Sequence, residues 1–138
     1  MMSSVRRCLA LVVVAAGALS VGCSRDKEVL AFMADFETFS NTIVQHVKTA
    51  PNVSAGVDAA QKYIDENKAS IHDKMVAIKD VKNFQIKDET KKKFEESLTN
   101  NAKTVANLPL EYVGQMVVTP GLQAKFEKLL KDYRDTIV

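Results

Sequence analysis

The fold is decided by residues 26–49, DKEVLAFMADFETFSNTIVQHVKT, where apolar side chains recur every three or four positions. This spacing places them on one face of an α-helix. The face comprises Val29, Phe32, Met33, Phe36, Phe39, Ile43 and Val47. Asp26 and Glu28 suit the positive end of a helix dipole, and Pro51 follows shortly after the last periodic residue. Residues 26–49 are therefore predicted to form an amphipathic helix.

Three further segments carry the same periodicity, at residues 54–81, 88–107 and 120–137. Their apolar faces are Val57, Ala60, Ile64, Ile71, Met75 and Ile78 in the first, Phe94, Leu98, Ala102, Val105 and Leu108 in the second, and Leu122, Phe126, Leu129, Leu130, Tyr133 and Ile137 in the third. Four such helices with short connections are typical of an up-down-up-down bundle. We therefore predict an all-α fold, an antiparallel up-down four-helix bundle.

Polar residues mark the ends and interruptions of these segments. Asn52 or Ser54 can cap the second helix, and its apolar face is interrupted around Asn67. Thr119 before a proline is a start signal for the last helix. Between the third and fourth segments, apolar residues keep helical spacing after Pro109, so we expect a short extra helix at about 109–118.

The first 22 residues have the parts of a secretory signal peptide. Arg6 and Arg7 form its basic start, and residues 9–19 form an apolar core. That core is shorter than the roughly 20 residues that span a bilayer as a helix. Residues 1–22 are therefore predicted to be a cleaved signal peptide.

The end of this signal, Ser20-Val21-Gly22-Cys23, resembles the lipobox of bacterial lipoproteins, a family that usually has Leu at the place of Ser20. The resemblance implies that Cys23 becomes the first mature residue and carries a diacylglyceryl thioether and usually an N-acyl chain. Two or more chains hold a protein stably on a membrane. Ser24 in place of Asp then favours the outer membrane over the inner, facing the periplasm. The alternative is an ordinary cut after Ala18, which would leave Cys23 as a free thiol.

Processing of the signal would divide the chain into a lipidated N-terminus with a short tether, residues 23–28, and one helical bundle domain, residues 29–138. Without Arg6 and Arg7 the count of Lys+Arg falls from 19 to 17, which equals the 17 Asp+Glu. A neutral domain gives no indication of nucleic-acid binding. The only other cysteine, Cys8, leaves with the signal, so no disulfide is expected.

Catalytic and cofactor signals are weak. His46 and His72 belong to no HExxH or Glu-x-x-His motif, and Met33 and Met75 are more simply core residues than haem ligands. The chain contains no G-x-S-x-G elbow, P-loop or G-x-G-x-x-G. We therefore predict no catalytic, metal-binding or cofactor-binding residue, and no enzyme.

Two surface features have competing interpretations. The basic run 91–93 could touch lipid head groups, but the acidic residues around it favour a solvated helix face. Phe32, Phe36 and Phe39 favour burial in the core; the competing hypothesis is an apolar groove for a partner helix or an acyl chain, gated by residues 108–118.

Together these patterns predict a membrane-anchored bacterial lipoprotein of the cell envelope. Its small helical domain would bind an unidentified protein partner or associate with the envelope, without catalysis. The alternative is a helical-bundle carrier of a small apolar ligand or cofactor in the periplasm.

Overall fold

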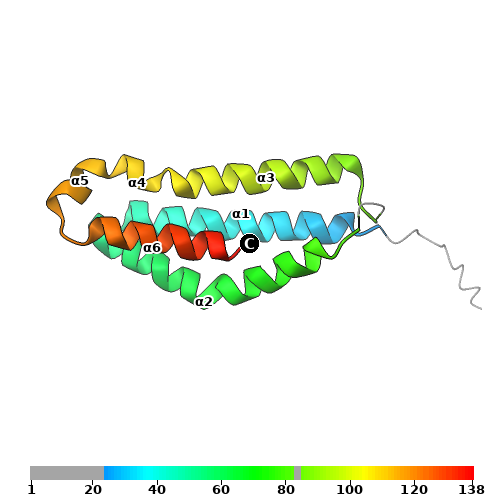
Figure 1. Cartoon of the computed structure of the whole chain (residues 1–138), viewed down its shortest axis with the longest axis horizontal. Coiled ribbons are helices and arrows are strands. Elements are labelled where there is room, and N and C mark those ends of the chain that lie inside the picture. The colour runs from blue at the N-terminus through cyan, green and yellow to red at the C-terminus, as the bar shows by residue number, and fades with distance from the viewer. Residues whose placement is uncertain (1–23, 83–84) are drawn as a thin grey trace, which may run out of the picture.

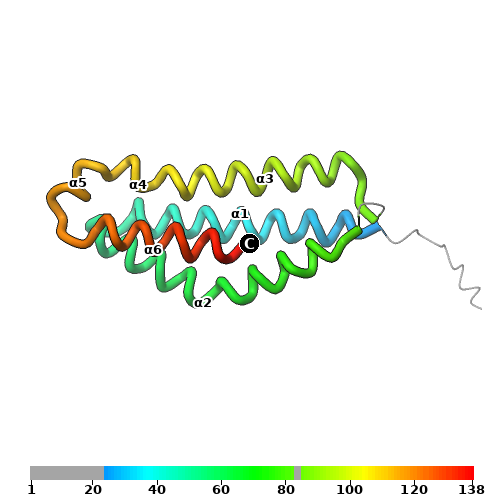
Figure 2. The backbone as a smooth tube through the Cα atoms, viewed as in Figure 1, coloured from blue at the N-terminus to red at the C-terminus, as the bar shows by residue number. Residues whose placement is uncertain are grey.

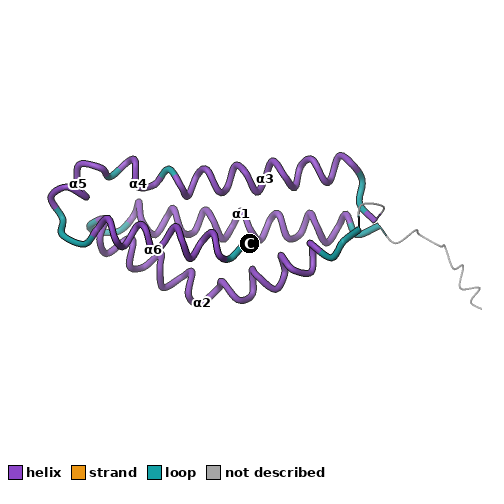
Figure 3. The backbone as a smooth tube through the Cα atoms, viewed as in Figure 1, coloured by secondary structure: helices purple, strands orange, loops and turns teal. Residues whose placement is uncertain are grey.

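Six helices and no strand make up residues 24–82 and 85–138, the part of the chain that the computed structural model describes (Figure 3). They are α1 (Asp26–Thr49), α2 (Val53–Lys79), α3 (Asp88–Ala106), α4 (Leu108–Glu111), α5 (Val113–Val118) and α6 (Leu122–Asp135). The prediction of an all-α helical bundle is confirmed. None of these helices is both long and apolar enough to cross a bilayer.

The four long helices lie along one axis and alternate in direction along the chain, while α4 and α5 turn the chain at one end (Figure 1). The closest packing joins α1 to α2, α1 to α3, and α2 to α6, whereas α3 and α6 touch much less. The order around the bundle is therefore α1, α2, α6, α3. Two neighbouring pairs, α1 with α3 and α2 with α6, run in the same direction (Figure 2).

The core is built on the apolar face of α1. All of its predicted residues are buried except Met33, which is half-buried. Phe36 and Phe39 stack on the ring of Tyr133 from α6, with centroid distances of 5.8 and 6.0 Å. The Tyr133 hydroxyl lies 2.7 Å from the Ser40 hydroxyl, which also donates to the Phe36 carbonyl at 2.9 Å. Side chains of the first and last helices therefore meet across the centre of the bundle.

Helix α2 is bent near its middle (Figure 1). Its buried face stops at Ile64 and resumes at Ile71, so residues 65–70 bury no side chain. Within this gap the Asn67 amide donates to the Tyr63 carbonyl at 2.8 Å. A side chain that bonds a carbonyl of the preceding turn competes with the helical ladder and bends a helix. The interruption predicted around Asn67 therefore coincides with the bend.

The two predicted helix starts have different outcomes. Asn52 caps α2, because its side-chain oxygen accepts from the Ala55 N–H at 2.9 Å. The prediction that Thr119 caps the last helix is wrong. Helix α6 begins at Leu122, and its N-cap is Gly121 at φ +79°, a conformation that favours glycine.

Helices α1 and α2 approach each other closely at Gly56. A Cβ added there would lie 2.7 Å from the Val47 carbonyl oxygen and 2.8 Å from that of His46. Both obstacles are backbone atoms, which cannot turn away as a side chain could. Glycine at this position therefore allows the start of α2 to pack against the end of α1.

We expect Gly56→Ala to lower the free energy of unfolding by about 1–3 kcal/mol, because the two helices must separate. Gly114→Ala is the matched control: an added Cβ meets nothing within 4 Å there. Alanine at this helical site should raise the free energy of unfolding by about 0.5–1 kcal/mol. Urea denaturation measures both. Equal midpoints for the two variants would contradict the close approach.

The buried Tyr133 hydroxyl predicts a fall in stability at alkaline pH. Burial raises its pKa to about 12, above the value of about 10 for an unfolded tyrosine. The raised pKa means that its contribution is intact below pH 10 and is lost as the pH rises toward 12. Between pH 10 and 12 the free energy of unfolding should fall by on the order of 2 kcal/mol in the wild type, and Tyr133→Phe should abolish this fall. Urea denaturation between pH 9 and 12 measures the loss, and Tyr112→Phe should retain it.

Candidate functional site

The predicted lipidation residue, Cys23, and the predicted signal peptide lie outside the described residues, which begin at Ser24. The prediction that residues 23–28 form a tether is wrong for residues 26–28: helix α1 starts at Asp26, so these residues form its first turn. Only Ser24 and Arg25 separate Cys23 from a helix of the bundle. We call Ser24, Arg25 and Asp26, together with the residues Gln85 and Lys87 that they contact, the junction.

Backbone groups tie this junction to the segment between α2 and α3. The Arg25 N–H donates to the Gln85 carbonyl at 2.8 Å, and the Asp26 carboxylate accepts from the Lys87 N–H at 3.0 Å. The Ser24 hydroxyl donates to the other Asp26 oxygen at 2.5 Å. These bonds hold the start of α1 beside the start of α3, so the chain leaves the bundle at a fixed place.

Hydrogen bonds also set the charge of Asp26. The bond from the Ser24 hydroxyl, then those from the Lys87 N–H and the Thr90 hydroxyl, lower the pKa of Asp26 to about 2. Each donor stabilises the ionised carboxylate more than the protonated acid. Asp26 is therefore charged throughout the physiological range, at the positive end of the α1 dipole.

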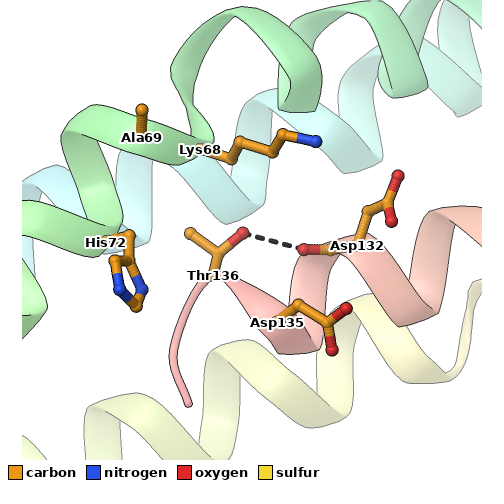
Figure 4. A pocket seen from close by; sticks show the side chains of 6 residues that line it. All are labelled: Lys68, Ala69, His72, Asp132, Asp135 and Thr136. Atoms are coloured by element: carbon orange, nitrogen blue, oxygen red, sulfur yellow. Dashed lines mark hydrogen bonds between the residues drawn. The ribbon is translucent and has the colours of Figure 1, made fainter.

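A surface pocket of about 350 Å³ lies where the bend of α2 faces the end of α6. It is lined by Lys68, Ala69, His72, Asp132, Asp135 and Thr136 (Figure 4). The Thr136 hydroxyl donates to the Asp132 carbonyl at 2.9 Å, so its proton is already held. Nδ1 of His72 is buried and has no hydrogen-bond partner among the described residues. These groups form no hydrogen-bonded nucleophile and base.

The carboxylates of this pocket are already neutralised by their own helix. Asp132 accepts from Lys128 Nζ at 2.6 Å and from the Gln61 amide at 2.7 Å, and the first of these is the main cause of its lowered pKa. Asp135 accepts from Lys131 Nζ at 2.6 Å and raises the pKa of that lysine. Within residues 24–82 and 85–138, no three His, Cys, Asp or Glu side chains are placed to hold a metal ion.

The other residues singled out from the sequence take part in packing or in surface ion pairs. His46 packs its ring 5.5 Å from that of Tyr63, and Met75 is buried in the core. Lys93 lies 2.6 Å from Glu89, and Lys92 lies 3.9 Å from Glu96, each one turn away on the exposed face of α3. These pairs agree with a solvated face.

Phe32, Phe36 and Phe39 are sealed, with at most 3% of each residue exposed. Their rings pack on one another, on Phe94 and on Tyr133. This face therefore serves as core. The surface pockets that Phe32 and Phe39 help to line lie between α1 and α2, and residues 108–118 line neither of them. A carrier of an apolar ligand would need a space other than this stripe.

The turn between α3 and α6 departs most from expectation. The single helix predicted at about 109–118 is two short helices, α4 and α5, separated at Tyr112. Leu108 is buried, and Tyr112 packs its ring 5.9 Å from that of Phe126. Leu110, Val113, Val117 and Val118 instead face solvent, with exposed fractions of 70%, 50%, 82% and 75%. We call these four residues the apolar tip.

Helices α4 and α5, which carry the apolar tip, lie at the end of the bundle opposite the start of α1 (Figure 1). It is also nearly free of charge, because residues 104–124 include one charged residue, Glu111. That carboxylate lies 2.9 Å from Lys48 Nζ of α1. The two ends of the bundle therefore differ in chemistry: one is charged and tied by hydrogen bonds, and the other is apolar and exposed.

The junction predicts an acid dependence of stability. The pKa of Asp26 is lowered on folding, so its contribution is present above pH 4 and is lost as the pH falls toward about 2. Asp26→Asn should remove this part of the acid dependence. Thermal unfolding between pH 2 and 5 measures it, with Glu37→Gln, an exposed acid of the same helix, as the control. Identical pH profiles for wild type and Asp26→Asn would contradict the junction.

No protein family, curated protein or solved structure matches this chain.

Proposed function

We propose that this chain is a lipid-anchored protein of the bacterial envelope whose small helical bundle binds another protein and carries out no catalysis. The single observation that carries the proposal is the placement of Cys23. It follows a signal-like segment, and only Ser24 and Arg25 separate it from a helix whose start is tied in place. Its proposed location is a membrane surface that faces the periplasm. Ser24, which stands where Asp would favour the inner membrane, favours the outer membrane.

The chemistry of the chain around Cys23 supports an anchor. After removal of residues 1–22, Cys23 is the only cysteine, so no intramolecular disulfide competes for its sulfur. A free thiol in an exported chain would be reactive and could form a disulfide with another chain. Thioether formation removes that thiol, and each buried CH₂ of the acyl chains contributes about 0.8 kcal/mol to membrane binding.

The junction would also determine how the anchored bundle stands. Two residues span at most about 7 Å when fully extended. Helix α1 has 24 residues, which corresponds to a length of about 36 Å. A bundle held at its α1 start would therefore remain near the membrane surface, with its apolar tip at most about 40 Å from the lipid.

The pocket between the bend of α2 and the end of α6 supports a binding role over catalysis. The side pocket holds a hydroxyl that bonds a backbone carbonyl and acids that are paired with lysines. The described residues bring no nucleophile into contact with a base in this pocket, and no three of their His, Cys, Asp or Glu side chains are placed to hold a metal ion. The surface of the domain has stronger indications of binding than of chemistry.

Metabolic labelling with radioactive palmitate tests the anchor. Wild-type chain should incorporate label and fractionate with membranes, whereas Cys23→Ala should lose essentially all label. Cys8→Ala is the matched control: it removes a thiol of the signal segment and should leave labelling unchanged. Equal labelling of Cys23→Ala and wild type would overturn the proposal, as would an unlabelled chain that begins at Leu19.

A further inference from the structure

We propose that α3 opens from the bundle as one unit while α1, α2 and α6 stay packed on one another, and that hydrogen bonds to Asp26 control this opening. Such a movement is independent of the proposed function, because it would occur whether or not Cys23 carries an anchor.

Among the four long helices, α3 buries the fewest apolar side chains. Of its 19 residues it buries Thr90, Asn101 and Val105, and only Val105 is apolar. Helix α6 is shorter, with 14 residues, yet it buries four large side chains. Burial of an apolar face supplies most of the free energy that holds a helix in a protein. Helix α3 therefore loses the least when it leaves the bundle.

A polar residue interrupts the apolar face of α3. Phe94 packs its ring 6.0 Å from that of Phe32 on α1, but both Phe94 and Leu98 are only half-buried. Asn101 takes the next place on the same face, and its amide donates to the Ser97 carbonyl at 2.9 Å. That bond lies within α3, so it does not hold α3 to another helix.

The seam between α3 and α6 is also poorly filled. A hollow of about 250 Å³ lies there, and α3 contributes only the small side chains of Ala102 and Ala106 to its lining. The rest of the lining comes from α6 and the residues after it: Leu130, Tyr133, Arg134 and Ile137. Small side chains beside a hollow make few contacts, so this seam adds little to the hold on α3.

Polar side chains join α1, α2 and α6 without the help of α3. The Gln61 amide of α2 donates to Asp132 of α6 at 2.7 Å, and the Ser40 hydroxyl of α1 lies 2.7 Å from that of Tyr133. Within the described part of the chain, residues 91–106 form no hydrogen bond or ion pair with another long helix. The bonds among the other three helices would therefore survive the opening of α3.

The two ends of α3 are held differently. Near its end, Val105 and Leu108 are fully buried. At its start, the Asp26 carboxylate accepts hydrogen bonds from the Lys87 N–H, at 3.0 Å, and from the Thr90 hydroxyl. We call these two bonds the clasp. Asp26 is partly exposed, so water can replace the clasp, whereas the buried end would lose apolar contacts. Helix α3 should therefore open from the clasp and pivot near Val105.

Hydrogen exchange followed by mass spectrometry tests the inference on the whole chain as cells produce it, held in detergent micelles. A detached helix of 19 residues is marginal in water, so its backbone N–H groups exchange whenever α3 opens. We expect the amides of residues 92–106 to share one protection factor. It should be at least tenfold below the protection factors in the middle of α1, α2 and α6.

Two variants distant from α3 distinguish its own opening from unfolding of the whole domain. Gly56→Ala forces α1 and α2 apart, and Asn52→Ala removes the cap of α2. Both changes weaken contacts that remain when α3 is open. Exchange in α1, α2 and α6 should therefore accelerate about threefold or more, while exchange in α3 stays within twofold of the wild type. Asn52→Ala is the milder change and preserves the test if Gly56→Ala does not fold.

Two aspartates of α1 test the clasp. Asp26→Ala removes both bonds to the start of α3 and should accelerate exchange in α3 about fivefold or more. Asp35→Ala is the matched control, because the Asp35 carboxylate lies 2.6 Å from Lys74 Nζ of α2 and this contact remains when α3 opens. Exchange in α3 should then stay within twofold of the wild type.

Three results would overturn the inference. The first is protection of α3 equal to that of the other long helices. The second is acceleration of exchange in α3 by Gly56→Ala or Asn52→Ala as large as in α1, α2 and α6, since α3 would then open only when the whole domain unfolds. The third is unchanged exchange of α3 in Asp26→Ala, which would show that the clasp does not control the opening.

Discussion

The rings of Phe36 and Phe39 stack on Tyr133 and so join the first helix of the bundle to the last. Ser40 and Tyr133, whose hydroxyls are hydrogen-bonded beside these rings, lie 93 positions apart in the sequence. Burial of each large side chain contributes about 1.5–3 kcal/mol. No disulfide is available to the domain after residue 23, so such burial must offset the chain entropy lost on folding. With α6 in place, α4 and α5 must bridge back from the end of α3. The position of the exposed turn therefore depends on this aromatic contact.

Periodicity determined what could be predicted about the helices. The stripe of α1 has only one pattern that repeats over 24 residues, so its bounds and its buried face were both predictable. The bend of α2 coincides with a gap in the apolar pattern, which also has a sequence signal. The order of helices around the bundle has none. The hydrogen bonds that join α1 to the start of α3 are donated by the backbone N–H groups of Arg25 and Lys87. Every residue except proline has such a group, so the sequence does not mark these two positions.

The turn between α3 and α6 shows a second limit of sequence reasoning. Leu108, Tyr112 and Met116 repeat every four residues, and Leu110, Val113 and Val117 repeat every three or four. Both sets satisfy the spacing of a helix face, and only the contact with Phe126 decides which set faces the core. Similarly, Thr119-Pro120 is a valid start signal, but the left-handed conformation of Gly121 places the actual start two residues later. Neither outcome could be read from spacing alone.

The hydrogen bonds at the junction have a mechanical consequence. A pull on the chain before Ser24 would reach α1 and, through Arg25 and Asp26, the residues at the start of α3 at the same time. The load is shared between two parallel helices instead of peeling one from its neighbours. Shear between packed helices requires many side-chain contacts to fail together, whereas peeling breaks them one turn at a time. Tension applied before Ser24 would therefore act on the end of the bundle where these hydrogen bonds join the starts of two helices.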